Sequence, residues 1–235
     1  RTRSRSSIAL CRRSNSPTSD HVTTPAADAR TAAVVVAAGR GTRYGAPKHS
    51  LRLGGVELWQ RSVDTLTSAG VAPIVVVGDV PGGVSGGERR RDSVANGLAE
   101  IDGVPWVLIH DAARPLVTVN LVQRVIERLS RGDVDGVVPG VPIPDTVKRV
   151  REGMVMDTVD RRDLDTVQTP QGFRLEALWA AHRMFPGMDA TDDAGLVEAN
   201  GGRVATVDGD VDNFKVTFPD DLERAARIVA GSTST

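Results

Sequence analysis

The sequence predicts an α/β protein whose centre is an open, mostly parallel sheet. Short β-branched runs such as Val34–Val36 alternate with longer segments that have the apolar period of helices. These runs are apolar at every position, as expected of parallel strands that are buried on both faces. We therefore expect a Rossmann-like sheet with helices on both faces, formed by one domain over residues 31–235.

Composition narrows the class of protein. The chain of 235 residues is 40% hydrophobic and carries a net charge of −1, which fits one sizeable core and argues against a general nucleic-acid-binding protein. No apolar run approaches the length of a membrane span, so we expect no membrane partner. The single cysteine, Cys11, provides no disulfide frame and no thiolate metal site, and it favours a reducing, cytoplasmic location.

Residues 1–30 have the composition of a disordered tail. They hold five arginines before the first acid, Asp20, with much serine, threonine and alanine and no apolar period. The Arg/Ser bias also resembles an organelle transit peptide, but an amphipathic face is lacking. We treat the segment as lying outside the fold.

The first part of the domain reads as alternating strands and helices. A helix with one apolar face ends at Gly70 and leads into a buried strand, and Asp92 or Ser93 is a candidate cap for the next helix. The elements expected after the strand at 34–36 are a helix at 58–70, a strand at 74–77, a helix from 92 or 93 to 101, a strand at 106–109, a helix at 118–130 and a strand at 136–141.

Residues 142–172 have a different character. They contain prolines and two short alternating strands at 146–150 and 154–159, without a helical period. Such a hairpin outside the main sheet suits a β-arm that packs on a partner subunit. The elements expected after the arm are helices at 174–184, at 191–199 with Thr191 as its cap and at 220–230, and a strand at 204–208.

The stretch from Val34 to Lys48, VVVAAGRGTRYGAPK, has the character of a strand, a phosphate-binding loop and an anchor lysine. Gly39 and Gly41 allow a sharp turn that brings backbone N–H groups close to an anion, and Arg43 and Lys48 supply positive charge. The spacing matches neither a Walker loop nor a dinucleotide fingerprint, which disfavours an NAD-dependent oxidoreductase. A solvated turn is the alternative interpretation of the loop.

The motif A-A-G-x-G-x-R followed by P-K resembles the signature loop of the nucleotidyltransferases that join a nucleoside triphosphate to a sugar or polyol phosphate. The later motifs HDAARP, TVDR, QTPQ and DNxKVT narrow the resemblance to the cytidylyltransferases that act on 2-C-methyl-D-erythritol 4-phosphate. It runs from about Ala32 to about Leu222. The resemblance implies CTP and a polyol phosphate as substrates, Mg²⁺ as cofactor, a homodimer formed through the β-arm, and a place in non-mevalonate isoprenoid biosynthesis.

Transfer of a cytidylyl group uses an anionic phosphate as nucleophile, so it needs charge neutralisation and a metal rather than a strong base. The resemblance assigns catalytic roles to Arg43 and Lys48, as a clamp on the triphosphate, and to Lys215, near the transferred phosphoryl group. Asp111, in HDAARP, matches the aspartate that faces Mg²⁺, and Asp212 is a candidate second metal ligand. We expect these side chains to converge on one hollow.

A further segment resembles the family's cytosine-reading element, G-G-x-x-R-x-x-S. Small residues and polar side chains satisfy the edge of a pyrimidine and leave no room for a purine. A glycine loop that leads into a helix capped by Ser93 is the alternative interpretation. The nucleotide-binding residues implied by the resemblance are Ala37, Ala38, Gly39, Gly41, Gly87, Glu88, Arg90, Ser93, Asp111 and Ala112.

Hydroxyl groups and cations are the side chains expected around a polyol phosphate acceptor. In the family, the arginine of the arm reaches the active site of the neighbouring subunit, and Arg161 matches it in this chain. The residues implied to bind the acceptor are Thr146, Arg161, Thr169, Thr191 and Lys215.

The chain departs from the family's pattern between Val77 and Gly86, where eight residues replace a helix and a further strand. In a sheet ordered 3-2-1-4 the missing strand is an outer one. We therefore expect a smaller sheet with reduced stability, or an edge that residues 78–87 cover. Gly87 and Glu88 follow the shortened segment closely, so their match to the family's base-reading positions, and hence the base selectivity, depends on how the segment folds.

Two other functions remain open from the sequence. Ribitol 5-phosphate cytidylyltransferases share most of these motifs and differ in the acceptor. A non-catalytic nucleotide-binding protein of this fold is the second alternative.

Overall fold

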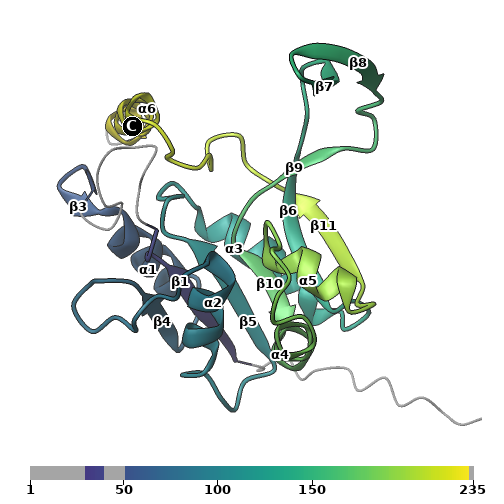
Figure 1. Cartoon of the computed structure of the whole chain (residues 1–235). Coiled ribbons are helices and arrows are strands. Elements are labelled where there is room, and N and C mark those ends of the chain that lie inside the picture. Colours follow the sequence, from purple (N-terminus) through teal and green to yellow (C-terminus); the bar gives the residue numbers. More distant parts are fainter. Residues whose placement is uncertain (1–29, 40–50, 233–235) are drawn as a thin grey trace, which may run out of the picture.

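The fold is built around one mixed sheet. The computed structural model describes residues 30–39 and 51–232 of the chain. The sheet has the strand order β11-β6-β10-β5-β1-β4, with β9 paired to β6 (Figure 1). Its strands are β1 (Thr31–Val36), β4 (Ile74–Val77), β5 (Trp106–Asp111), β6 (Gly136–Pro142), β9 (Asp165–Val167), β10 (Gln171–Arg174) and β11 (Val204–Asp208).

Strand β1 lies in the middle of the parallel half of the sheet. It runs parallel to β4 on one side and to β5 on the other, with Val36 in register with both Val77 and Asp111. Strand β11 is parallel to β6, whereas β10 is antiparallel to β5 and to β6. The carboxyl ends of β1, β4 and β5 therefore meet at one edge, where open α/β sheets bind their ligands. The predicted α/β class is confirmed.

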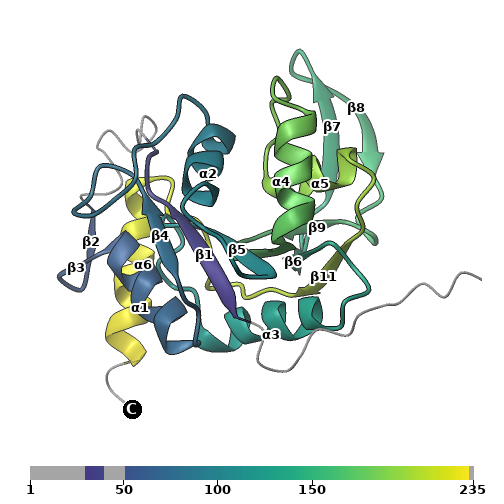
Figure 2. The same cartoon turned by 90° about the horizontal axis from the view of Figure 1, so that it is seen from below.

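Helices cover both faces of the sheet, because alternate side chains of a strand point to opposite faces. Val34 packs in one core with α2, α4 and α5, and Val35 packs in a second core with α1 and α3 (Figure 2). The helices are α1 (Leu58–Ser68), α2 (Arg90–Leu98), α3 (Val119–Ser130), α4 (Leu175–Met184), α5 (Asp193–Ala199) and α6 (Pro219–Ser232). None of these described helices is long and apolar enough to cross a membrane.

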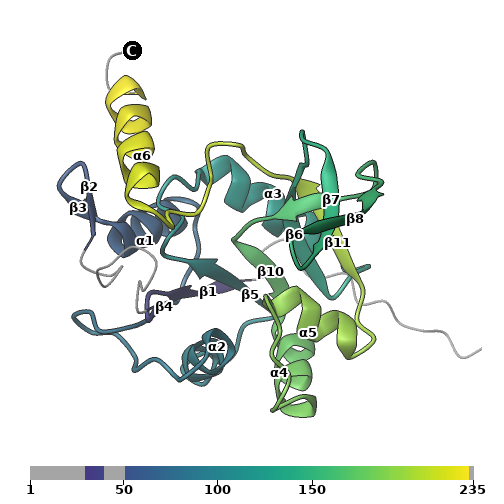
Figure 3. The ribbon, with the colours of Figure 1, turned by 45° about the horizontal axis from the view of Figure 1, so that its top comes forward.

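The C-terminal helix α6 lies outside both helix layers. It packs on the small hairpin of β2 (Arg52–Leu53) and β3 (Val56–Glu57) and on the start of α1, through an apolar cluster that includes Leu58 and Ala225. Figure 3 shows α6 beside this hairpin and far from the arm. The segment between β11 and α6 therefore crosses the carboxyl edge of the sheet, and Val216 N donates to Ala113 O at 2.7 Å on the way.

The β-arm is shorter than predicted. A hairpin of β7 (Val147–Arg151) and β8 (Met154–Val159) projects from the body and pairs with no other described strand (Figure 1). The predicted limits of the arm, 142–172, are wrong at the C-terminal end, because β9 pairs with β6 and β10 lies between β5 and β6. Strand β10 escapes prediction because its sequence, QGFR, is too short to show an apolar period.

The edge next to β4 is partly covered by the shortened segment. Val84 forms a single parallel bridge with Val77. Val84 N donates to Val76 O, and Gly78 N donates to Val84 O, both at 2.8 Å. One residue thus takes the place of the missing outer strand, and the expectation that residues 78–87 cover the edge is confirmed in this limited form.

Two helices begin at other residues than predicted. Helix α2 has Arg89 as its N-cap, and Asp92 lies one turn inside, where its Oδ2 accepts from Arg89 N at 3.1 Å. Helix α5 is capped by Asp192, whose side chain accepts from Gly195 N at 3.0 Å, so the prediction of Thr191 as cap is wrong. At α5 two neighbouring polar residues compete for the cap, and spacing alone does not choose between them. At α2 the N-cap residue makes no side-chain cap bond, and Asp92 acts from the third helical position instead.

Candidate active site

The first loop begins in a tight contact at the carboxyl edge of the sheet. Ala37 N donates to Val77 O at 2.7 Å, and Ala112 N donates to Val36 O at 3.1 Å. A Cβ atom at Gly86 would lie 2.4 Å from Ala38 Cβ, so only glycine allows this approach. Ala37, Ala38 and Ala112, predicted to bind the nucleotide, therefore lie together with the glycine segment that precedes α2.

Asp111 lies at the centre of a cluster of charged side chains. Its carboxylate, 11% exposed, accepts from Arg90 Nε at 3.0 Å and from Lys215 Nζ at 2.6 Å. Strand β5 supplies the aspartate, α2 the arginine, and the segment before α6 the lysine. Asp111 and Lys215, which we expected to converge, are in direct contact.

The cations around Asp111 keep it ionised. Burial by itself raises the pKa of this carboxyl group, but the charges of Arg90 and Lys215 outweigh burial and hold the pKa of Asp111 far below its ordinary value. Burial lowers the pKa of Arg90, and the carboxylates of Asp111 and Asp193 more than reverse this, so that its pKa is raised. Asp111 and Arg90 are therefore both charged at neutral pH.

Arg90 joins Asp111 to a second carboxylate. Its Nη1 donates to Asp193 Oδ2 at 2.6 Å, and Asp193 is completely buried at the start of α5. On the other side, Asp193 Oδ1 lies 3.5 Å from the buried His182 Nε2. The guanidinium thus holds two carboxylates from different elements, and the base-reading role of Arg90 stays a prediction.

The rest of the predicted cytosine element forms a compact turn. Ser93 Oγ accepts from Gly87 N at 3.0 Å and donates to Arg89 O at 3.3 Å. Gly87 is required there, because a Cβ atom would lie 2.4 Å from Asp92 Cβ. The alternative role of Ser93 as the helix cap is wrong, since α2 begins before it. Glu88 is exposed at the tip of the turn, so its contact with the base stays a prediction.

Thr169 supports Asp111 from behind. Its buried hydroxyl accepts from Asp111 N at 3.0 Å and lies 3.1 Å from His110 Nδ1. Burial lowers the pKa of His110 to about 4, so this imidazole is neutral at physiological pH. Asn213 Nδ2 donates to Thr169 O at 2.9 Å, which ties the segment before α6 to the same point. Thr169 was predicted to bind the acceptor, and its hydroxyl is already used inside the protein.

The other predicted acceptor residues lie apart from the charged cluster. Thr146 and Arg161 are exposed at the base of the arm, where Arg161 Nη1 donates to Ile143 O at 2.7 Å. Thr191 is exposed just before α5. Within the described residues, none of the three hydrogen-bonds to Asp111 or Lys215, so their acceptor role stays a prediction.

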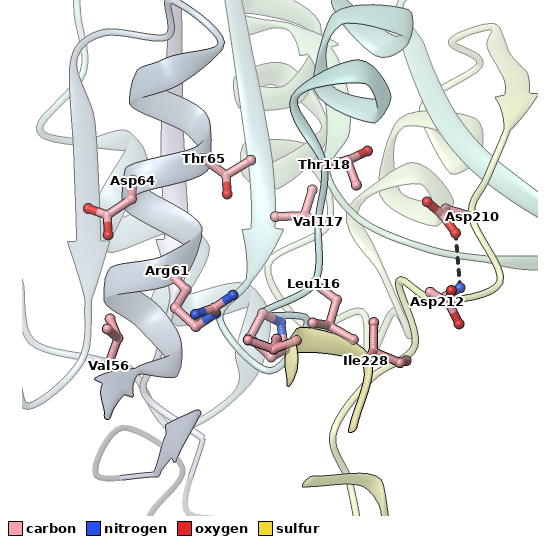
Figure 4. A pocket seen from close by; sticks show the side chains of 12 residues that line it. Val56, Arg61, Asp64, Thr65, Leu116, Val117, Thr118, Asp210, Asp212 and Ile228 are labelled. Atoms are coloured by element: carbon pink, nitrogen blue, oxygen red, sulfur yellow. Dashed lines mark hydrogen bonds between the residues drawn. The ribbon is translucent and has the colours of Figure 1, made fainter. Parts of the chain in front are cut away.

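Asp212 lies in different surroundings from Asp111. Its carboxylate is 3.5 Å from Arg224 of α6, and its backbone N donates to Asp210 Oδ1 at 3.0 Å. Asp210 and Asp212 line a cavity of about 670 Å³ between α1, α6 and the turn before α3, whose lining includes neither Asp111 nor Lys215 (Figure 4). The described residues contain no group of three or more acidic, histidine or cysteine side chains that could hold a metal. Asp212 as a second metal ligand therefore stays a prediction without support from this geometry.

Part of the predicted site lies outside the described residues. Gly41, Arg43 and Lys48 belong to the segment 40–50, which the structure does not describe. Gly39 is the last described residue of the first loop, and a Cβ atom there would contact nothing within 4 Å. The triphosphate clamp of Arg43 and Lys48 stays a prediction.

Comparison with known proteins decides the family. A family model described as IspD, 2-C-methyl-D-erythritol 4-phosphate cytidylyltransferase, matches residues 31–231. The chain belongs to this family. The chain is 43% identical over 215 residues to the 2-C-methyl-D-erythritol 4-phosphate cytidylyltransferase of Rhodococcus jostii, a match that covers 84% of this chain and 94% of the relative.

Two further comparisons agree with the assignment. The crystal structure of the 2-C-methyl-D-erythritol 4-phosphate cytidylyltransferase from Thermus thermophilus superimposes with a TM-score of 0.75 at 35% identity, covering 86% of this chain and 99% of that one. The bifunctional enzyme IspD/IspF of Rhodospirillum rubrum is 43% identical over 224 residues, and the match covers 86% of this chain. The match spans 58% of the bifunctional enzyme's length.

Sequence reasoning missed Asp193 and His182 as members of the charged cluster. A signal for Asp193 was present: it lies three and four residues before Leu196 and Val197, so it shares the buried face of a helix with them. A carboxylate on such a face requires a cation nearby. The partner, Arg90, is 103 residues away in the sequence, and no local pattern connects the two.

Proposed function

We propose that this chain transfers the cytidylyl group of CTP to 2-C-methyl-D-erythritol 4-phosphate and releases pyrophosphate, as a step of isoprenoid biosynthesis. Membership in a cytidylyltransferase family supports the activity. The observation that carries the proposal is the contact of Asp111 with Arg90 and Lys215 at the carboxyl edge of β1 and β5. One carboxylate and two cations at that edge suit a nucleoside triphosphate with its metal.

The chemistry needs positioning more than acid–base catalysis. The acceptor phosphate is already ionised, so the protein has to neutralise charge on the triphosphate and hold an in-line approach. Lys215, whose side chain is 38% exposed, is free on its outer side to contact a phosphate while it remains near Asp111. We assign it the role of stabilising the negative charge that develops during transfer. Arg43 and Lys48 complete the proposed clamp.

The donor set fits Mg²⁺ only together with the nucleotide. Mg²⁺ prefers six oxygen ligands and is commonly held by one or two carboxylates and phosphate oxygens. Asp111 provides one such carboxylate, and its low pKa keeps it ionised. The remaining oxygens would come from the triphosphate and water, and Mg²⁺ would neutralise the phosphate charge and orient it.

We further propose a cytoplasmic homodimer in which the β7–β8 arm packs on the partner. The arm carries four exposed apolar side chains, Val150, Met154, Val155 and Met156, which are between 55% and 69% exposed in the single chain. Exposed apolar side chains of this kind on a projecting hairpin are typical of an interaction surface. In this arrangement Arg161 at the base of the arm would approach the acceptor site of the partner.

A coupled pyrophosphate assay tests the proposed function. The chain is supplied with CTP, Mg²⁺ and either 2-C-methyl-D-erythritol 4-phosphate or ribitol 5-phosphate. We expect turnover with the first acceptor, and turnover with ribitol 5-phosphate alone would assign the alternative cytidylyltransferase activity. Binding of CTP without product from either acceptor would favour the non-catalytic alternative.

A further inference from the structure

Asp193 is a buried carboxylate with one strong partner. Its Oδ2 accepts from Arg90 Nη1 at 2.6 Å, and its Oδ1 has no hydrogen-bond partner among the described residues. A buried carboxylate is costly unless a cation neutralises it, and Arg90 is the cation in contact. The same guanidinium holds Asp111 through Nε at 3.0 Å. Arg90 therefore divides one positive charge between two carboxylates.

The charges of these four residues balance. Arg90 and Lys215 contribute two positive charges, and Asp111 and Asp193 contribute two negative ones, which sum to zero. Without the charge of Asp193 the group would carry a net charge of +1, located on the two cations that contact Asp111. Such an excess repels a divalent cation near Asp111 and attracts an anionic triphosphate. Loss of the Asp193 charge would therefore weaken binding of the metal and strengthen binding of the nucleotide.

We propose that Asp193 is a positioning residue for cytidylyl transfer: it holds Arg90 across Asp111 and balances its charge, so that the Asp111 carboxylate stays available to the Mg²⁺ that accompanies CTP. This inference rests on the proposed function. Asp193 acts through Arg90, because the buried carboxylate lies behind the guanidinium. Groups that orient a metal ligand from behind in this way contribute to metal affinity without touching the metal.

Asp193→Asn separates charge from geometry. The amide has the same shape, and its oxygen can still accept from Arg90, but the negative charge is gone. Calorimetric titration of CTP in EDTA and in Mg²⁺, without an acceptor, gives two dissociation constants for each variant. Their ratio measures how much Mg²⁺ tightens CTP binding. We expect Asp193→Asn to lower this ratio about 10- to 100-fold, with the affinity in EDTA unchanged or higher.

A purely structural role predicts a different result. Damage to the fold would weaken CTP binding equally in EDTA and in Mg²⁺ and leave the ratio at its wild-type value, which would overturn the inference. Asp192→Asn is the matched control, because Asp192 caps α5 and binds Gln171 at 2.7 Å but does not contact Arg90. We expect the wild-type ratio for this variant, and an equal decrease in both variants would also overturn the inference.

A second variant keeps the test decisive if Asp193→Asn does not fold. Arg90→Lys retains the positive charge, but a single ammonium group lacks the fork that reaches both carboxylates. We expect a lower ratio for this variant too, and the wild-type ratio would overturn the inference. The inference would also be overturned if the wild-type chain bound CTP with the same affinity in EDTA and in Mg²⁺. The titration involves no turnover, so a wild-type chain that binds CTP but forms no product rejects the proposed function separately.

Discussion

Replacing Gly97 by alanine tests how closely α2 must approach the sheet. Gly97 lies in α2 on the face that packs against β1 and β4, and an added Cβ atom would lie 2.5 Å from Val34 Cγ1 and 2.7 Å from Val77 Cγ2. Both valines are completely buried, and β-branched side chains have little rotational freedom. Carbon atoms pack at about 3.5–4.0 Å, so α2 has to lift by about 1 Å.

The expected loss of stability follows from two opposing effects. Overpacking in a core costs about 1–3 kcal/mol, whereas replacing glycine by alanine inside a helix contributes about 1 kcal/mol of stability. Contacts of 2.5 Å and 2.7 Å with two stiff valines place the overpacking cost at the upper end of this range, about 2–3 kcal/mol. We therefore expect Gly97→Ala to lower the free energy of unfolding by about 1–2 kcal/mol, measured by urea denaturation. Because α2 carries Arg90 at its start, we also expect a higher KM for CTP in the pyrophosphate assay.

Gly231→Ala is the matched control for this prediction. Gly231 is also helical, in α6, but an added Cβ atom there meets nothing within 4 Å. Helix propensity then acts alone, and we expect unchanged stability or a gain of up to about 1 kcal/mol. If Gly97→Ala were as stable as the wild type, or if both variants lost stability equally, the argument from close packing would be refuted.

Three further predictions concern acid stability, catalysis and assembly. Burial lowers the pKa of His110 from 6.5 to about 4, so the unfolded chain binds this proton first as the pH falls. The free energy of unfolding should therefore decrease by up to about 3 kcal/mol between pH 6.5 and 4. In urea unfolding of His110→Asn this pH dependence should be weaker, and the same dependence as in the wild type would contradict the prediction. Lys215→Met should lower kcat about 100-fold or more while circular dichroism shows a normal fold, and near-normal turnover would remove Lys215 from the mechanism. Met154→Asp with Met156→Asp should shift the chain toward monomer in analytical ultracentrifugation, because two exposed apolar side chains of the arm become charged; an unchanged sedimentation coefficient would place the interface elsewhere.

The sequence reveals the elements with strong periodicity. The strands at Ile74–Val77 and Val204–Asp208 are found at the predicted residues, and α3 begins one residue after its predicted start because Thr118 is the cap. The helix has an apolar stripe over its whole length and a capping threonine, and the two strands are mostly apolar runs between turn residues. Short strands without such a pattern, β9 and β10, are recognisable only from their partners in the sheet.

The candidate site was predictable where a residue's neighbours in the sequence determine its place. Asp111 follows a buried strand, so its position at the carboxyl edge could be foreseen from HDAARP. Its contacts with Arg90 and Lys215 depend on the packing of α2 and on the path before α6, 21 and 104 residues away. Asp193 could be recognised as a buried carboxylate from its spacing to Leu196 and Val197, but its pairing with Arg90, 103 residues away, could not be predicted.

The return of the chain from the arm has a mechanical consequence. After the hairpin, the backbone passes through β9 and reaches Thr169, whose hydroxyl holds the amide of Asp111 and whose carbonyl holds Asn213. The chain thus leads directly from the arm, the proposed dimer interface, to the residue that supports the Asp111 carboxylate, the proposed metal ligand. In the proposed dimer, we therefore expect a displacement of the hairpin to reach Asp111 through Thr169, so that dimer formation and turnover are coupled.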